Sequence, residues 1–382
     1  MNISDFLIPL TEPLLINTGE TRRVFSCRRG YRLTLVGRTD VWNEYSGTGE
    51  LVEPVFLTEK DNDPLTVLEE ARHHLQCVLT ALQGKRIDIS SFRNELEQLL
   101  CQLDDGGLAA AIASFAIEQA FLVLVARARS DSLSSVIHEY IFDKRSTRFG
   151  HCVLKINTLY NTRGGGDTPA DNANGAVKIK VGNKDVVEDA DIINRFIAHQ
   201  PANDCRVRID VNRMWNIDEA VRFVENLSEC AVRAMEYIEE PVNVASIGEL
   251  RAAINELRLR SVTWSCIPIG IDESMLLPGI EEILTDDPKL QLIYKPSLHG
   301  IRKWKQFLKR HPNRITVTCT FETGVGLLFL TNLAFALNPD AYHGIHALPD
   351  MVKNDFSTKR FSELVSGGDS IVISDLVDVM SS

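Results

Sequence analysis

The stretch Ala176–Gly182, with the sequence AVKIKVG, is the segment that decides the fold class. Side chains two residues apart share one face of a β-strand, so its apolar residues face one way and Lys178 and Lys180 face the other. A buried ammonium group is costly to desolvate and calls for an anion beside it. Taken alone, the pattern also fits a strand that turns one polar face to water.

Four later segments repeat this design, because each ends an apolar alternating run with a charge. They are RVRIDVN with Asp210, YIEEPV with Glu239, IGIDES with Asp272 and LIYKPS with Lys295. The charges recur at intervals of about 30 residues, which is the length of one strand, one helix and their loops. Strand ends with this period converge on the C-terminal rim of a parallel barrel, so we expect the charges to meet there.

Strand-like and helix-like segments alternate throughout residues 151–350. No Gly-rich dinucleotide fingerprint follows the first strand, so the pattern favours an α/β barrel over an open doubly wound sheet. The predicted strands are Val153–Leu159, Ala176–Val181, Arg206–Val211, Met235–Glu239, Ile267–Ile271, Leu290–Tyr294, Ile315–Thr320 and a weak one at Tyr342–Ile345. The predicted helices are Asp185–His199, Asp218–Cys230, Ser246–Arg260, Ile301–Arg310 and Val325–Leu337.

The segments on either side of this barrel have a different pattern. Residues 1–150 carry strand-like runs and then grouped helices at 65–82, 89–100 and 108–127, which predicts an α+β domain. Residues 351–382 contain the strand-like stretch SIVISDLV, and we expect this segment to return to the first domain. The glycine-rich stretch 163–175 lacks the residues of a phosphate loop, so we interpret it as a flexible connection.

Composition excludes several classes of partner. The 382 residues carry a formal net charge of −11, which argues against binding to nucleic acid or to an anionic membrane. The eight cysteines form no CxxC pair, as is typical of reduced thiols in the cytosol. We expect no secretory signal and no membrane span of about 20 apolar residues, and hence a cytoplasmic location.

The clustered charges indicate a particular chemistry. Any one of Asp210, Glu239 and Asp272 also fits a helix cap or a surface acid, but three carboxylates at one rim repel one another unless a cation lies among them. A site made of oxygen ligands suits Mg²⁺. A metal ion flanked by lysines suits proton abstraction next to a carboxylate, because the enediolate that develops needs preorganised cations.

The motifs KxKVG, DxNRxW, EEP, DES and KP(S/T)LxG, in this order, resemble the enolase superfamily. Within it they are similar to the muconate-lactonizing-enzyme-like branch and to its o-succinylbenzoate synthase family. The similarity extends from Ile156 to Asp350, and more faintly to Ser114–Gln119 and to Gly49 and Glu50. It implies a modified TIM barrel, (β/α)7β, under an N-terminal α+β capping domain that the C-terminal tail rejoins.

The resemblance also implies roles for the charged residues. Asp210, Glu239 and Asp272 would ligate Mg²⁺, or Mn²⁺ in its place. The substrate would be a small anionic cyclohexadiene carboxylate, 2-succinyl-6-hydroxy-2,4-cyclohexadiene-1-carboxylate. Lys180 would take its α-proton and return it to the departing hydroxyl. This syn dehydration gives o-succinylbenzoate in menaquinone or phylloquinone biosynthesis.

The two other lysines would act as cations in this reaction. Lys178 would hold the substrate carboxylate, and Lys295 would stabilise the enediolate or lie over the ring of the substrate.

Five further residues are candidates for supporting roles. Asn212 would support the metal site, and Arg208 would orient the carboxylates or the substrate. Thr320, Thr323 and Gly324 lie in the segment TCTFETGVG, whose backbone amides would meet the succinyl tail.

Other functions remain open. Another reaction of the same superfamily, such as N-acylamino-acid racemisation, dipeptide epimerisation or muconate cycloisomerisation, would use the same lysines. A noncatalytic barrel that only binds a metal or an aromatic acid is the alternative from another class. The sequence leaves open whether the protein is a monomer or a homo-oligomer. We interpret His299, His343 and His346 as packing or surface residues.

Overall fold

The computed structural model describes residues 2–18, 21–38, 44–57, 63–82, 86, 88–103, 107–146, 153–161, 175–182, 185–200, 205–366 and 370–372. The glycine-rich stretch lies outside these residues except for Gly175, as does Cys152. Most of the predicted C-terminal strand SIVISDLV also lies outside them.

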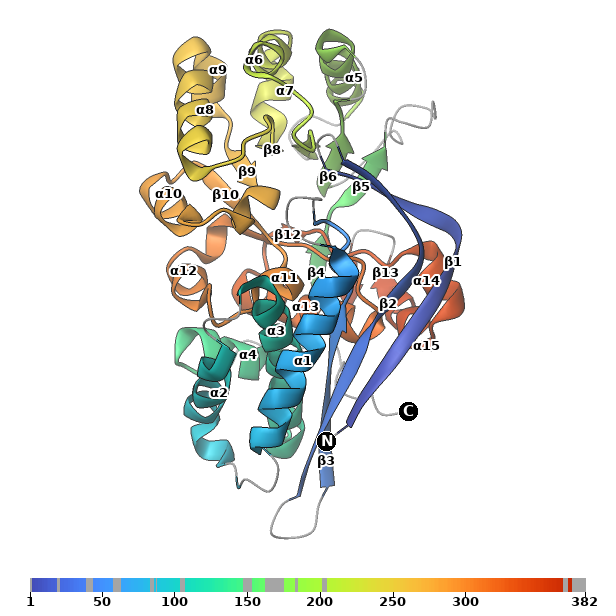
Figure 1. Ribbon diagram of the computed structural model, residues 1–382. Coiled ribbons are helices and arrows are strands. Elements are labelled where there is room, and N and C mark those ends of the chain that lie inside the picture. The colour runs from blue at the N-terminus through green and yellow to red at the C-terminus, as the bar shows by residue number, and fades with distance from the viewer. Residues whose placement is uncertain are drawn as a thin grey trace.

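The N-terminal region is an antiparallel sheet packed on helices. Its strands lie in the order β1 (Asn2–Thr18), β2 (Thr21–Arg38) and β3 (Glu44–Val52). The helices are α1 (Pro64–Leu82), η2 (Ile89–Ser91), α2 (Phe92–Leu100), η3 (Cys101–Leu103), α3 (Gly107–Arg129) and α4 (Leu133–Phe142). Figure 1 shows the long strands running beside α1 and α3.

Two glycines allow β3 to pack closely on α3. A Cβ at Gly47 would lie 1.9 Å from the carbonyl oxygen of Ala120, and one at Gly49 would lie 2.1 Å from that of Ala116. Real atoms do not approach this closely, so only glycine fits at either position. The sheet and the helix therefore meet backbone to backbone.

Helix α3 corrects one expectation. Among the described helices, α3 alone is long and apolar enough to cross a membrane. No such segment was expected from the sequence. However, 78% of its most apolar 18-residue stretch is buried within the protein, and the helix packs against β3, β2 and α1. In this structure α3 is the core helix of the capping region, which explains its apolar surface.

The second region is a ring of short strands. Seven lie in one parallel sheet, in the order β11-β10-β9-β8-β7-β6-β5. Their bounds are β5 (Thr158–Asn161), β6 (Gly175–Lys180), β7 (Cys205–Asp210), β8 (Met235–Glu239), β9 (Ile269–Ile271), β10 (Leu290–Tyr294) and β11 (Ile315–Val317). Most of the predicted strands are confirmed to within two or three residues.

Two further strands connect the ends of this sheet. β12 (Tyr342–His343) pairs in parallel with β4 (Val153–Ile156), and β4 continues into β5 after a break at Asn157. The amide of Gly344 donates to the carbonyl of Val317 at 2.9 Å, which joins β11 to the end of β12. The weak eighth strand of the sequence pattern is therefore present, and the predicted barrel fold is confirmed.

Helices cover the outside of the ring. They are α5 (Val186–Ala198), α6 (Ile217–Glu225), α7 (Glu229–Ala234), α8 (Ile247–Arg260), α9 (Val262–Cys266), η5 (Glu273–Leu276), α10 (Ile280–Asp286), α11 (Pro296–His299), α12 (Lys305–Arg310), η6 (Pro312–Arg314), α13 (Gly324–Leu337), α14 (Pro349–Asn354) and α15 (Phe356–Ser362). The single helix predicted over 218–230 is wrong in one respect. Ser228 caps a second helix by accepting from Ala231 N, so the segment forms α6 and α7.

The C-terminal segment contacts both regions. Asn354 donates to the carbonyl of Pro9 in β1 at 3.1 Å, and Asp355 forms a 3.0 Å ion pair with Arg32 of β2. Beyond these contacts, β13 (Val365–Ser366) pairs with β14 (Ser370–Val372), and β14 pairs with β4 at the start of the barrel. The segment thus links the capping sheet to the barrel.

Candidate active site

Strand register brings the predicted charges together. Lys180 of β6 is paired with Asp210 of β7, which is in turn paired with Glu239 of β8. Glu239 also pairs with Gly270 of β9, and Asp272 lies two residues further on and so on the same face. Lys295 directly follows β10. All five charges lie at the C-terminal ends of their strands, as the sequence pattern predicts.

Lys178 lies between two of the carboxylates. Its Nζ is 2.9 Å from Asp210 Oδ2 and 2.9 Å from Glu239 Oε2, and it donates to Glu239 Oε1 at 2.9 Å. Burial disfavours its charged form, but the charges of Asp210 and Glu239 outweigh this and raise the pKa of Lys178 well above its usual range. Lys178 is therefore a fixed cation.

The other two lysines differ in how tightly they are held. Lys295 is buried and forms an ion pair with Asp272, and its ammonium lies 4.5 Å from the ring centroid of Phe56. Burial opposes its charge, but the carboxylates of Asp272 and Glu273 raise the pKa of Lys295. The side chain of Lys180 is 32% exposed, and its Nζ lies 3.6 Å from Asp210 Oδ2. Lys180 is thus the most accessible of the three.

The three acids are buried and perturb one another. Burial opposes ionisation of Asp210, but Lys178 and Lys180 lower its pKa strongly. Burial and then the charges of Asp210 and Asp272 raise the pKa of Glu239 well above its usual range, despite Lys178. Three carboxylates crowded in a buried site hold a proton unless further positive charge compensates them.

The donor set fits a hard divalent cation, although the side chains as they lie do not form a closed cage. No three His, Cys, Asp or Glu side chains among the described residues surround one point in a metal-holding arrangement. The reason is that Lys178 and Lys295 lie against the acids. Even so, three buried carboxylates at one rim, held at present by ammonium groups, are the ligands that Mg²⁺ prefers. Binding of an ion would require these two ammonium groups to move aside.

A second network, which the sequence analysis did not predict, holds the loop of Asp272. Glu240 accepts from the amide of Asp272 at 2.9 Å, and from the amide and hydroxyl of Ser274 at 2.8 and 2.9 Å. Arg213 donates to Glu240 at 3.2 Å and to Ser274 at 3.0 Å. In the sequence, Glu240 is the second glutamate of the EEP motif and Ser274 is the serine of the DES motif, so both could have been considered as supports of Asp272. Their side chains set the position of Asp272.

Arg208 of β7 and Asn212, two residues after β7, were both predicted to support the site, but their contacts differ. The guanidinium of Arg208 binds Glu236 at 2.7 Å, Asn157 at 3.3 Å and the carbonyl of Tyr342 at 2.8 Å. None of these partners belongs to the three acids, so Arg208 joins β7 to β8, the split first strand and β12. The contact of Asn212 with the site is through its backbone amide, which donates to Asp210 Oδ1 at 3.2 Å.

The predicted contacts at the start of α13 are largely taken by the protein itself. Glu50 of β3 accepts from the amides of Thr323 and Gly326 at 2.9 and 3.1 Å. The amide of Gly324 donates to the hydroxyl of Thr358 at 2.9 Å. A substrate tail would have to replace these bonds to the capping region and α15, and the predicted contact stays a prediction.

Thr320 is also occupied by protein partners. Its hydroxyl lies 2.7 Å from Glu322 Oε1 and 2.8 Å from the hydroxyl of Ser297, and its carbonyl accepts from Arg28 of β2 at 3.2 Å. An aromatic side chain of the capping region, that of Phe56, also lies at the site, and the sequence pattern did not predict it. The ring of Phe56 stacks on the ring of Phe321, with 5.5 Å between the centroids, and it also contacts the ammonium of Lys295.

Comparison with known proteins agrees with this geometry. Residues 169–278 match the family model described as enolase C-terminal domain-like. This match spans Lys178 and Lys180 of the KxK motif and all three acids. This segment of the chain is therefore similar to the C-terminal domain of enolase-like proteins.

Two solved structures are similar to nearly the whole chain. The L-Ala-D/L-Glu epimerase from Bacillus subtilis is 17% identical with a TM-score of 0.64, over 97% of this chain and 95% of that one. The o-succinylbenzoate synthase from Thermosynechococcus elongatus, with Mg in its active site, is 17% identical with a TM-score of 0.60, over 95% and 99%. At this identity the similarity establishes the fold.

Among curated proteins, an o-succinylbenzoate synthase from an Enterobacter species is 27% identical over 175 residues. The match covers 45% of this chain and 50% of the relative. The chain thus spans about half the length of the curated relatives it matches.

Proposed function

We propose that the protein is an o-succinylbenzoate synthase. It would catalyse the Mg²⁺-dependent syn dehydration of 2-succinyl-6-hydroxy-2,4-cyclohexadiene-1-carboxylate in menaquinone or phylloquinone biosynthesis. The similarity to the Enterobacter synthase supports this choice of reaction. The seven cysteines in the described part of the chain are unpaired, which supports a reducing compartment such as the cytoplasm.

One observation carries the proposal, namely the unequal surroundings of the three lysines. Lys178, with 17% of its side chain exposed, and the buried Lys295 both lie against carboxylates that raise their pKa values, so they remain cationic. Lys180 is 32% exposed and has a looser ion pair at 3.6 Å. A proton shuttle must reach the substrate and change its protonation state, whereas an electrostatic stabiliser must keep its charge. Lys180 fits the first role, and the other two fit the second.

Asp210, Glu239 and Asp272 would hold Mg²⁺. The ion would lower the energy of the enediolate by stabilising its negative charge. Lys180 takes the proton from the carbon next to the ring carboxylate, and the electron pair of that C–H bond moves into the carboxylate. Lys295 supplies a fixed positive charge beside the dianion. The electron pair then returns, the bond to the ring hydroxyl breaks, and Lys180 donates its proton to the leaving oxygen, giving water and an aromatic ring.

The direct test is turnover by purified protein with Mg²⁺, followed as formation of o-succinylbenzoate by chromatography. Lys180→Ala is expected to reduce kcat by at least about 10³-fold, since it removes the base in both steps. Lys155→Ala, which removes an exposed lysine of β4, is the matched control and should leave kcat unchanged. Turnover that survives in Lys180→Ala would refute the assignment.

A second candidate is epimerisation of a dipeptide or an N-acylamino acid. Lys180 follows the second strand of the ring and Lys295 the sixth, so the two lie on opposite sides of the barrel. Epimerisation needs a base on each face, so Lys295→Ala would abolish it and would leave residual dehydration. Proton exchange of L-Ala-L-Glu in D₂O, measured by NMR, separates the two reactions. Absence of turnover of either substrate would favour a noncatalytic barrel.

A further inference from the structure

A large cavity lies between the capping region and the barrel, apart from the candidate active site. It has a volume of about 870 Å³ and is bounded by α2, η3 and α3 on one side and by η5, α11 and α12 on the other. None of the three acids and neither lysine of the KxK motif lines it. Its volume is within the range of cavities that hold small organic ligands.

About half of the surface that lines this cavity is apolar. Leu103, Met275 and Leu298 are more than nine-tenths buried and still face the cavity. Further aliphatic side chains complete the lining, from Leu100, Leu108 and Leu276. These walls fit the hydrocarbon part of a ligand.

Three polar groups at the same cavity lack protein partners. His299 is 5% exposed and Ser114 is 9% exposed, yet neither the imidazole nor the hydroxyl has a hydrogen-bond partner among the described residues. Lys303 lines the cavity and forms no ion pair with any described residue. Buried polar groups nearly always have partners, so His299 and Ser114 facing one cavity, with the exposed Lys303 beside them, indicate that a polar ligand group binds there.

The charges at the cavity favour an anion. Glu97 is ion-paired with Arg302 at 2.8 Å, and Asp143 with Arg93 at 3.0 Å, so both lining acids are neutralised. Among the described lining residues, the ammonium of Lys303 remains in excess. A carboxylate would pair with this ammonium and accept a hydrogen bond from Ser114 or from the N–H of His299.

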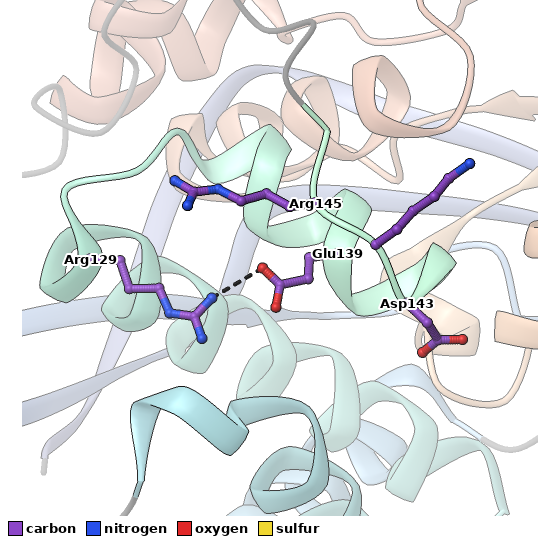
Figure 2. A pocket seen from close by; sticks show the side chains of 5 residues that line it. Arg129, Glu139, Asp143 and Arg145 are labelled. Atoms are coloured by element: carbon purple, nitrogen blue, oxygen red, sulfur yellow. Dashed lines mark hydrogen bonds and ion pairs between the residues drawn. The ribbon is translucent and has the colours of Figure 1, made fainter.

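A neighbouring pocket differs from this cavity because its charged side chains mostly have ion-pair partners. It is lined by Arg129, Glu139, Asp143, Lys144 and Arg145, and Figure 2 shows Arg129 pointing toward Glu139. That ion pair measures 3.1 Å, and Arg145 pairs with Asp131 at 2.9 Å. Its charges are mostly satisfied within the capping region, so this pocket indicates no ligand.

We propose that the 870 Å³ cavity is a second ligand site for a small amphipathic carboxylate, with its anion at Lys303, Ser114 and His299. The inference does not depend on the proposed dehydration. η5 begins directly after Asp272, and α11 begins directly after Lys295. A ligand packed on both segments would restrain the two loops that carry these charges.

The probe for the test is 2-naphthoate, titrated into the full-length protein by calorimetry, with 2-naphthamide as the neutral analogue. We expect a dissociation constant on the order of 1 mM or tighter for a ligand of this size. Lys303→Met should weaken binding by roughly fivefold or more, because the unpaired cation is lost. Arg310→Met removes an exposed cation of α12 outside the cavity and should leave binding unchanged.

Ala111→Trp should abolish binding by filling the cavity, while an unchanged melting temperature would show that the variant folds. Hydrogen exchange of residues 273–276 and 296–299 should slow when 2-naphthoate is bound. Binding that is unchanged in both Lys303→Met and Ala111→Trp would place the ligand elsewhere and overturn the proposal. Equal affinity for 2-naphthamide would overturn the carboxylate assignment, and no binding at all would overturn the site.

Discussion

Replacement of Glu50 by glutamine provides a sharp test of how the capping region is joined to the barrel. Glu50 is 2% exposed, and its Oε1 accepts both backbone bonds, from Thr323 and Gly326. Its Oε2 accepts from the hydroxyl of Thr323 at 2.5 Å. Glutamine has nearly the same shape, keeps the Oε1 acceptor and can donate to that hydroxyl. Glu50→Gln thus removes the charge and keeps the contacts.

The size of the effect follows from the pKa. Burial raises the pKa of Glu50 from 4.5 to about 7, and the bonds and charges around it only partly oppose this rise. The folded state therefore holds a proton that the unfolded state has lost. Glu50 favours folding most below pH 4.5, and this contribution disappears as the pH rises toward 7. The total is about 3 kcal/mol, so Glu50→Gln should gain up to that much relative to wild type between pH 5 and pH 8.

Glu50→Ala should behave in the opposite way. It leaves two buried N–H groups without an acceptor, at about 1–3 kcal/mol each. Urea unfolding at pH 5 and pH 8, followed by tryptophan fluorescence, measures both variants. Glu281→Gln, at an exposed position of α10, is the control for loss of a carboxylate. The reasoning is wrong if Glu50→Gln is destabilised as much as Glu50→Ala, or if its stability relative to wild type does not change with pH.

Three further outcomes follow from the structure. Gly47→Ala would force a Cβ to 1.9 Å from a backbone oxygen, so it should lower the free energy of unfolding, measured by urea titration, by about 2 kcal/mol or more. Gly37→Ala is the control, because its nearest contact would lie at 3.6 Å, and it should be nearly neutral. Glu240→Ala should weaken Mg²⁺ binding about tenfold by calorimetry, because the loop of Asp272 loses its acceptor, and Glu240→Gln should recover part of the affinity. Arg208→Met should lower the melting temperature through a loss of roughly 3 kcal/mol, while Arg206→Met, at a 58% exposed side chain, should not.

The barrel and the meeting of the charges could both be predicted from the order of the residues. Alternation of side chains within a strand is a local property, so the pattern of Lys178 and Lys180 was enough to assign their face. The recurrence of Asp210, Glu239 and Asp272 after successive strands then placed them at one rim, and the register confirms it. Parity also placed Arg208 inside the ring, but it did not indicate which partners Arg208 would bind.

Which groups remain available for a ligand depends on contacts between residues far apart in the chain. Glu50 and Thr323 are separated by 273 positions. No local pattern indicates that the carboxylate of Glu50 accepts hydrogen bonds from the start of α13. The same holds for Phe56 over Lys295 and for the cavity between α3 and α11. Such contacts depend on how two separately formed layers pack. Local periodicity therefore specifies the direction of a side chain but not the atoms that it meets.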